Sequence, residues 1–127
     1  MRIRLETDAY YLILNGIQRN NYELLVSPMH YKEIESIEDI REKIQLLEML
    51  SAYGGQPDFE LTNIKNRAEH LITMNFGVAD AVHLAFAEQS ADYFITCDDK
   101  LIKRSKKTKL TISVTNPVEF CINEELI

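Results

Sequence analysis

Apolar residues recur along most of this chain at the three- and four-residue intervals of an amphipathic helix. The clearest stripe runs through residues 37–53 and consists of Ile37, Ile40, Ile44, Leu47 and Leu50. This spacing predicts a helix with one apolar face toward a core, and the Gly pair at 54–55 predicts where the helix ends.

Further helices are indicated by the same periodicity or by residues that favour a helix start. Ser27 is a candidate N-cap with Pro28 at the first helical position, and Asn116 and Pro117 repeat this combination. The predicted helices span residues 28–36, 37–53, 62–74, 78–90, 98–107 and 116–126.

Three short apolar runs, at residues 22–27, 92–97 and 109–114, read as buried strands. Strands that alternate with helices predict an α/β fold with a mainly parallel sheet, although three strands are few for such a sheet. Gly, Pro and Asn cluster at residues 53–58 and 75–77, which we expect to be loops.

The opening stretch, MRIRLETDAYYLIL, fits two patterns. Polar and apolar residues alternate over 2–8, and Asn15-Gly16 is a hairpin signal, so a first strand is one interpretation. A helix is the other, since a Gly inside a helix costs only about 1 kcal/mol relative to Ala. The residues that would share one face of that helix are Leu5, Ala9, Leu12, Ile13 and Ile17.

Composition narrows the class of protein. The chain has 127 residues, 46% of them hydrophobic, so we expect one folded domain over residues 1–127. No apolar run has the length of a membrane span, and no secretory leader pattern is present. Two distant cysteines, Cys97 and Cys121, predict buried, reduced thiols in a cytoplasmic protein.

The net charge of −6 argues against a duplex-binding protein that works by charge alone. The charge is unevenly spread, because residues 100–109 hold six basic side chains. Such a block is usually a solvated helix end, and the alternative is contact with phosphates.

The predicted topology places Glu33 and Asp98, with Asp99 beside it, where chemistry occurs in α/β folds, and a further acid, Asp80, is notable for its apolar neighbours. Ligands collect beyond the carboxyl ends of parallel strands. Glu33 follows the strand at 22–27, and Asp98 and Asp99 follow the strand at 92–97. Asp80 lies among apolar residues in the alanine-rich helix. Each has an ordinary alternative: Glu33 as a solvated helix residue, Asp98 as a helix cap, and Asp80 as a charge that answers the helix dipole.

Taken together, these carboxylates favour a metal site. Converging carboxylates repel one another unless a cation is present, and oxygen ligands suit Mg²⁺ or Mn²⁺. Such ions activate water for attack on phosphate, so the pattern favours phosphodiester hydrolysis. His83 follows Asp80 on the same helical face, where it would bond Asp80, touch substrate or simply pack in the core. His30 and His70 have no partner at metal-ligand spacing.

The stretch FGVADAVHLAFAEQSADYFITCDDKLIKRSKK, followed by ISVTNPVEF, resembles PIN domains, the fold of VapC-type toxin ribonucleases. ELLVSPMHYKEI resembles the family's second strand and the helix that carries its second acid. The resemblance implies a three-layer α/β/α fold and a ribonuclease dependent on Mg²⁺ or Mn²⁺. Glu33, Asp80 and Asp98 would bind the metal, with Asp99 adjacent and assisting.

The family's first acid lies in a Leu-Asp-Thr pattern at the end of the first strand. RLETD offers a match with Glu6 in that position. However, in the PIN subgroup that this chain most resembles, such a segment belongs to the first helix, so we favour the helix. The first strand and its Asp are then expected to be missing, and an upstream sequence or a neighbouring chain would supply the strand.

Three functions remain to be compared. The first is a toxin-like RNA-cleaving enzyme, restrained by an antitoxin and expected to form a homodimer through exposed sheet edges. The second is a truncated or degenerate PIN protein that binds a partner without catalysis. A phosphoacceptor domain is a third, suggested only by DDK at a strand end. No membrane association is expected.

Overall fold

The protein is a mixed α/β chain that is mostly helical. The structure, a computed structural model, describes the backbone of residues 2–127 and the side chains of residues 7–127. The helices are α1 (Arg2–Gln18), α2 (Pro28–Glu35), α3 (Ile40–Tyr53), α4 (Leu61–Thr73), α5 (Val78–Ser90), α6 (Asp99–Lys106) and α7 (Pro117–Asn123). The strands are β1 (Leu24–Leu25), β2 (Gly54–Gly55), β3 (Tyr93–Ile95) and β4 (Ser113–Thr115).

The opening stretch of the chain is helical. Residues 2–18 form α1, so the alternative of a first strand with a hairpin at Asn15-Gly16 is wrong. Glu6 belongs to this helix, and its side chain lies outside the described part of the chain. Gly16 is needed inside α1 because a Cβ there would come 2.5 Å from the Tyr22 ring. The NG pair therefore marks a close packing contact and not a turn.

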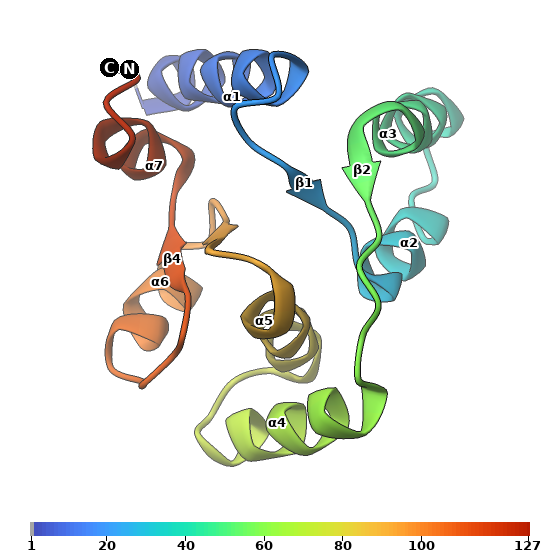
Figure 1. Cartoon of the computed structure of the whole chain (residues 1–127), viewed down its shortest axis with the longest axis vertical. Coiled ribbons are helices and arrows are strands. Elements are labelled where there is room, and N and C mark those ends of the chain that lie inside the picture. Colours follow the sequence, from blue (N-terminus) through green and yellow to red (C-terminus); the bar gives the residue numbers. More distant parts are fainter. Residues whose placement is uncertain (1) are drawn as a thin grey trace.

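The strands form two separate pairs where one sheet was expected. In the described chain, β1 pairs in parallel with β2, and β3 pairs in parallel with β4. Gly54-Gly55 was expected to lie in a loop, but it forms β2 and aligns with Leu24-Leu25. A Cβ on Gly54 would lie 2.6 Å from Val26 Cγ2, so the absence of a side chain permits this pairing. Figure 1 shows the β1–β2 pair beside α2 and α3, and β4 beside α6.

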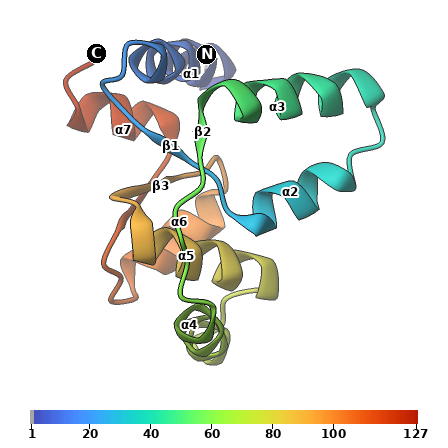
Figure 2. The same ribbon diagram turned by 45° about the vertical axis from the view of Figure 1, so that its right-hand side comes forward.

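The buried side chains fall into three clusters. The largest joins α4, α5, α6 and β4, with Leu71 and Leu84 fully buried. A second holds α1 against α7, where the Cys121 thiol donates to the Ala9 carbonyl at 3.6 Å. The third joins β1, α2 and α3 through Val26, Ile34 and Leu50. Figure 2 shows how these groups of helices surround the strands.

Two sequence expectations about burial fail. Along α3 only Leu50 of the expected stripe is buried, whereas Ile40, Ile44 and Leu47 are 72%, 49% and 38% exposed. Ile37 precedes α3 and packs, partly buried, against the third cluster, so the part of the stripe that faces outward is Ile40, Ile44 and Leu47. Cys121 is buried as expected, but Cys97 is exposed.

Among residues 2–127, no helix combines the length and apolar character that crossing a membrane requires.

Candidate functional site

Two strands and one helix direct the predicted acids toward one end of the molecule. β1 leads into α2, which carries Glu33, and β3 leads into Asp98 at the start of α6. The first turn of α5 carries Asp80. The electrostatic influence of both Asp98 and Glu33 reaches Asp80, so these three carboxylates share one neighbourhood.

The start of α2 is fixed by a local motif. Ser27 is buried, and its backbone N–H donates to His30 Nδ1 at 3.0 Å. His30 is the third residue of α2. Its side chain accepts the hydrogen bond of the Ser27 backbone N–H, which no helix carbonyl could accept. Pro28 adds a preset φ at the first position. These features set the direction of α2 and thus the position of Glu33.

Glu33 is held by His83 of α5. Glu33 Oε1 lies 2.7 Å from His83 Nε2, which donates, while the Glu33 side chain remains 52% exposed. His83 itself is only 8% exposed. The alternative in which His83 bonds Asp80 is not the one adopted, because Nε2 bonds Glu33, and the interpretation of His83 as a packed residue is confirmed. Since 50 residues separate the two, no spacing rule in the sequence indicated this pair.

The second ring nitrogen of His83 has no partner in the described structure. His83 Nδ1 is buried without a hydrogen bond. The ring lies 4.9 Å from the His30 ring and 5.8 Å from the Phe94 ring, centroid to centroid. Burial, and then the proximity of His83, lower the pKa of His30, which favours its neutral form. A neutral His30 agrees with the lone pair that Nδ1 presents to Ser27.

Asp80 shows the electrostatic strain of the site. Partial burial raises the pKa of Asp80, and Asp98 and Glu33 raise it further, while His83 and Arg104 act in the opposite direction. An acid with a raised pKa is more easily protonated in the folded state than in the unfolded state. Its contribution to stability is therefore largest below the unfolded pKa and falls as pH rises through the folded value. A bound cation would relieve this cost.

Asp98 is the N-cap of α6, as one of the two interpretations of this residue predicted. Its Oδ1 accepts hydrogen bonds from the backbone N–H of Lys100 at 3.0 Å and of Leu101 at 3.2 Å. Its own N–H donates to Thr96 Oγ1 at 3.1 Å. Both helix bonds use one carboxylate oxygen. Asp99 is the first residue of α6 and is exposed.

The carboxylate oxygens of Glu33, Asp80 and Asp98 are the type of ligand that a hard cation prefers, but they are not spaced as a ligand set. Within the part of the chain that the structure describes, no three His, Cys, Asp or Glu residues lie close enough together to hold a metal ion. Mg²⁺ keeps several water ligands and is commonly held by only one or two carboxylates. Asp80, with its electrostatic cost when ionised, is the residue that such an ion would favour most. The donor chemistry therefore fits a partly hydrated ion, whereas the spacing among the described residues forms no set of three ligands.

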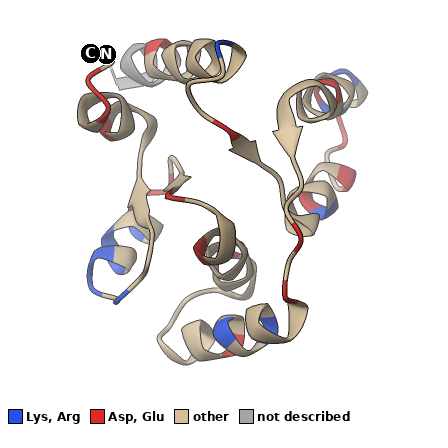
Figure 3. Ribbon diagram, in the orientation of Figure 1, with Lys and Arg blue, Asp and Glu red and all other residues tan. Residues whose placement is uncertain are grey.

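The basic run lies beside this acidic end. All six of its Lys and Arg side chains are exposed. Figure 3 shows these residues in blue along α6 and the turn after it. Arg104 is close enough to Asp80 to favour its ionised form. The interpretation as a solvated helix end therefore agrees with the exposure, and the charges remain accessible to a polyanion.

In comparisons with known proteins, the chain matches no family model, no curated protein and no solved structure.

Proposed function

We propose that the protein is a metal-dependent ribonuclease of the PIN type, with RNA as its substrate. The observation that carries this proposal is the common neighbourhood of Glu33, Asp80 and Asp98, in which partial burial first and then the charges of Asp98 and Glu33 raise the pKa of Asp80. Neighbouring carboxylates repel one another unless a cation lies between them. Carboxylates whose pKa is shifted in this way cluster at functional sites. The three-layer α/β/α arrangement of PIN domains belongs to the same proposal.

In this function, Glu33, Asp80 and Asp98 hold Mg²⁺ or Mn²⁺, and the adjacent Asp99 assists. Such an ion, when bound, supplies an activated water and neutralises charge on a phosphodiester. The chain's own residues have simpler tasks. His83 keeps Glu33 in place through the 2.7 Å bond, and the cap at Asp98 fixes the start of α6.

The basic side chains of α6 supply the contact with substrate. Lys103, Arg104 and Lys106 are exposed toward the end of α6, the helix that Asp98 caps. An RNA backbone that lies along α6 would pass the acidic end at Asp98. This arrangement compensates locally for the net charge of −6, which otherwise repels nucleic acid.

A second candidate is a PIN-like module that binds a partner without catalysis. It is favoured by the engagement of Glu33 with His83 and of Asp98 with the α6 backbone. The position of Glu6 in α1 also favours this candidate. Glu6 then does not end a strand, so the family's first acid has no counterpart in the described chain. An antitoxin, a homodimer and a cytoplasmic location belong to the toxin-like form of the first proposal.

RNA cleavage distinguishes the two candidates. We expect the purified chain to cut fluorescent single-stranded RNA in Mn²⁺, to stop when EDTA is added, and to lose at least a hundredfold in rate on Asp80→Asn or Asp98→Asn. Asn is a good helix cap, so the second variant preserves α6. Asp58→Asn is the matched control, because Asp58 is an exposed acid and is not among the groups that shift the pKa of Asp80. Cleavage that survives Asp98→Asn would overturn the ribonuclease proposal.

A further inference from the structure

The turn between α6 and β4 (residues 107–112) is held by a carboxylate that is almost fully buried. Glu88 lies in the last turn of α5, and its side chain is only 9% exposed. Glu88 Oε2 accepts hydrogen bonds from the Thr111 backbone N–H at 3.1 Å and from the Thr111 hydroxyl at 3.4 Å. Thr111 follows the basic run at 100–109 by two residues. The carboxylate therefore attaches the end of the basic run to the end of α5.

Arg67 of α4 makes a second attachment to the same turn. Arg67 Nε donates to Glu88 Oε1 at 2.7 Å, and Nη2 donates to Glu88 Oε2 at 3.3 Å. Nη2 also donates to the backbone carbonyl of Lys109 at 3.0 Å. Arginine can make all these bonds because its guanidinium carries five N–H donors in a fixed, planar fork. The Arg67–Glu88 pair thus joins α4, α5 and the turn.

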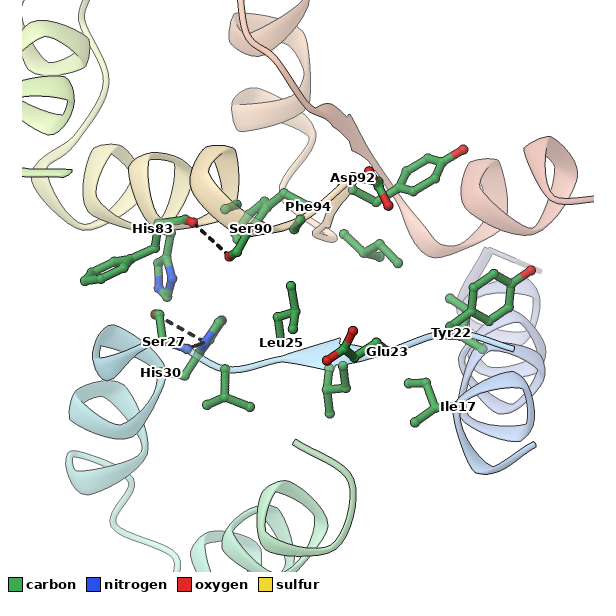
Figure 4. A pocket seen from close by; sticks show the side chains of 18 of the residues that line it. Ile17, Tyr22, Glu23, Leu25, Ser27, His30, His83, Ser90, Asp92 and Phe94 are labelled. Carbon is green, nitrogen blue, oxygen red and sulfur yellow. Dashed lines mark hydrogen bonds between the residues drawn. The ribbon is translucent and has the colours of Figure 1, made fainter. Parts of the chain in front are cut away.

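The pair lies at the far end of α5 and α6 from the acidic residues. Asp80 is in the first turn of α5, and Asp98, the cap of α6, is within its electrostatic reach. Figure 4 shows α5 continuing from His83 to Ser90. α6 ends at Lys106, and the residues just after it are bonded to the other end of α5. The two helices therefore run in the same direction, from the acidic end to the turn.

The length of α6 sets the distance between the acidic end and the turn. The eight residues of α6 span about 12 Å. Lys107 and Lys109 follow the helix, and both are exposed. Successive phosphates of one strand advance by about 3.4 Å in a stacked conformation. A strand that lies along α6 from Asp98 therefore brings to these lysines a phosphate about four nucleotides away.

The turn is ordered before any ligand arrives. Lys107 and Lys109 carry like charges, and three hydrogen bonds from the Arg67–Glu88 pair fix the backbone beside them. Ion pairs that are largely withdrawn from water add little net stability, because the cost of desolvation offsets the attraction. Their bonds nevertheless define a geometry. A turn that is already fixed loses less conformational freedom on binding, which strengthens affinity.

We propose that Arg67 and Glu88 are positioning residues, which hold Lys107 and Lys109 for an RNA phosphate about four nucleotides from the acidic end. This inference rests on the proposed function and adds to it a minimum length of substrate. An RNA of at least about five nucleotides reaches both the acidic end and the turn, whereas a shorter one reaches only one of them. Arg67 and Glu88 act through the turn and do not contact RNA themselves.

Binding of two RNA lengths tests the inference without cleavage. Fluorescein-labelled oligouridylates of 12 and 4 nucleotides are titrated with the full chain in EDTA and followed by anisotropy. For the 12-mer, Arg67→Met and Glu88→Gln should each lower affinity about fivefold, and reduce the slope of log K against log salt by about 1.4, or 0.7 for each of two phosphate contacts. The 4-mer should lose less than twofold.

Charge and folding are controlled separately. Arg67→Met and Glu88→Gln change the net charge in opposite directions, so an equal loss excludes a general charge effect. Lys65→Met is the matched control, because Lys65 is an exposed base of α4, and its loss should be equal for the two lengths. Hydrogen exchange at the Thr111 amide should become faster in both pair variants while circular dichroism shows a folded chain.

The lysines provide the second test. Lys107→Ala with Lys109→Ala should reproduce the loss for the 12-mer only, and adding Arg67→Met should cause no further loss, because all three changes remove the same contact. This lysine variant decides the question even if the pair variants do not fold.

Several results would overturn the proposal. They are equal losses for the two lengths, unchanged 12-mer binding when the Thr111 amide is released, full additivity with the lysine variant, and no 12-mer binding by the folded wild type. Equal binding of a 12-residue glutamate peptide would assign the turn to an acidic protein instead. The expected RNA binding without cleavage in Mn²⁺ would refute the ribonuclease activity alone.

Discussion

Replacing His83 by Leu should separate the stability of the fold from the function of the site. His83 is buried in α5, donates through Nε2 to Glu33 and leaves Nδ1 without a partner in the described structure. A buried polar group without a partner costs about 1–3 kcal/mol. Leu has a similar size and no polar atoms, so His83→Leu removes that cost.

His83→Leu also removes the hydrogen bond to Glu33, and this loss is smaller than the gain. The bond to Glu33 contributes about 1 kcal/mol, and Glu33, which is half-exposed, can turn to water instead. Leu also favours a helix by a few tenths of a kcal/mol relative to His. The expected result is a free energy of unfolding equal to that of the wild type or about 1 kcal/mol higher. For a chain of this size such a gain raises Tm by about 4 °C.

Urea unfolding at pH 7, followed by circular dichroism, measures this effect. His70→Leu is the matched control, because His70 is an exposed histidine on α4, and it should change stability by less than about 0.5 kcal/mol. Glu33→Gln should also be nearly neutral, since the Gln oxygen can still accept from His83. A loss of more than about 1 kcal/mol in His83→Leu would refute the reasoning that Nδ1 carries an uncompensated cost.

Three further substitutions test the fold. Gly16→Ala should destabilise by about 1–3 kcal/mol in thermal unfolding despite the better helix propensity, because the new Cβ meets the Tyr22 ring; a stabilised variant would show that Tyr22 packs elsewhere. Asp39→Ala should cost about 1 kcal/mol in urea unfolding, because Asp39 Oδ1 accepts from two N–H groups at the start of α3, whereas Asp39→Asn should cost much less. Ile44→Gln should change stability by less than about 0.5 kcal/mol, and a larger loss would place Ile44 in a core.

Helix ends were the features most accessible from sequence. Ser27-Pro28 and Asn116-Pro117 begin α2 and α7 as predicted, and Asp98 caps α6. These signals are local, because the cap bonds a backbone group two or three residues away. The helical assignment of the opening stretch was also confirmed, although the local pattern alone left a strand open.

What the sequence did not reveal depends on distant partners. The Glu33–His83 pair joins two helices, and its distance depends on how α2 and α5 pack. The apolar stripe of α3 was read correctly as helical, but periodicity cannot show that only the Leu50 end is covered. Likewise, Gly54 and Gly55 look like a loop in isolation and pair only because Leu24 and Leu25 lie beside them.

The central claim is that Glu33, Asp80 and Asp98 act together on a divalent cation. Calorimetric titration of Mn²⁺ into the wild-type chain and the Asp80→Asn variant tests it most directly. The account predicts one binding event per wild-type chain and binding at least tenfold weaker in Asp80→Asn, with Asp58→Asn unchanged. Equal Mn²⁺ binding by the wild type and Asp80→Asn, or none by the folded wild type, would contradict it.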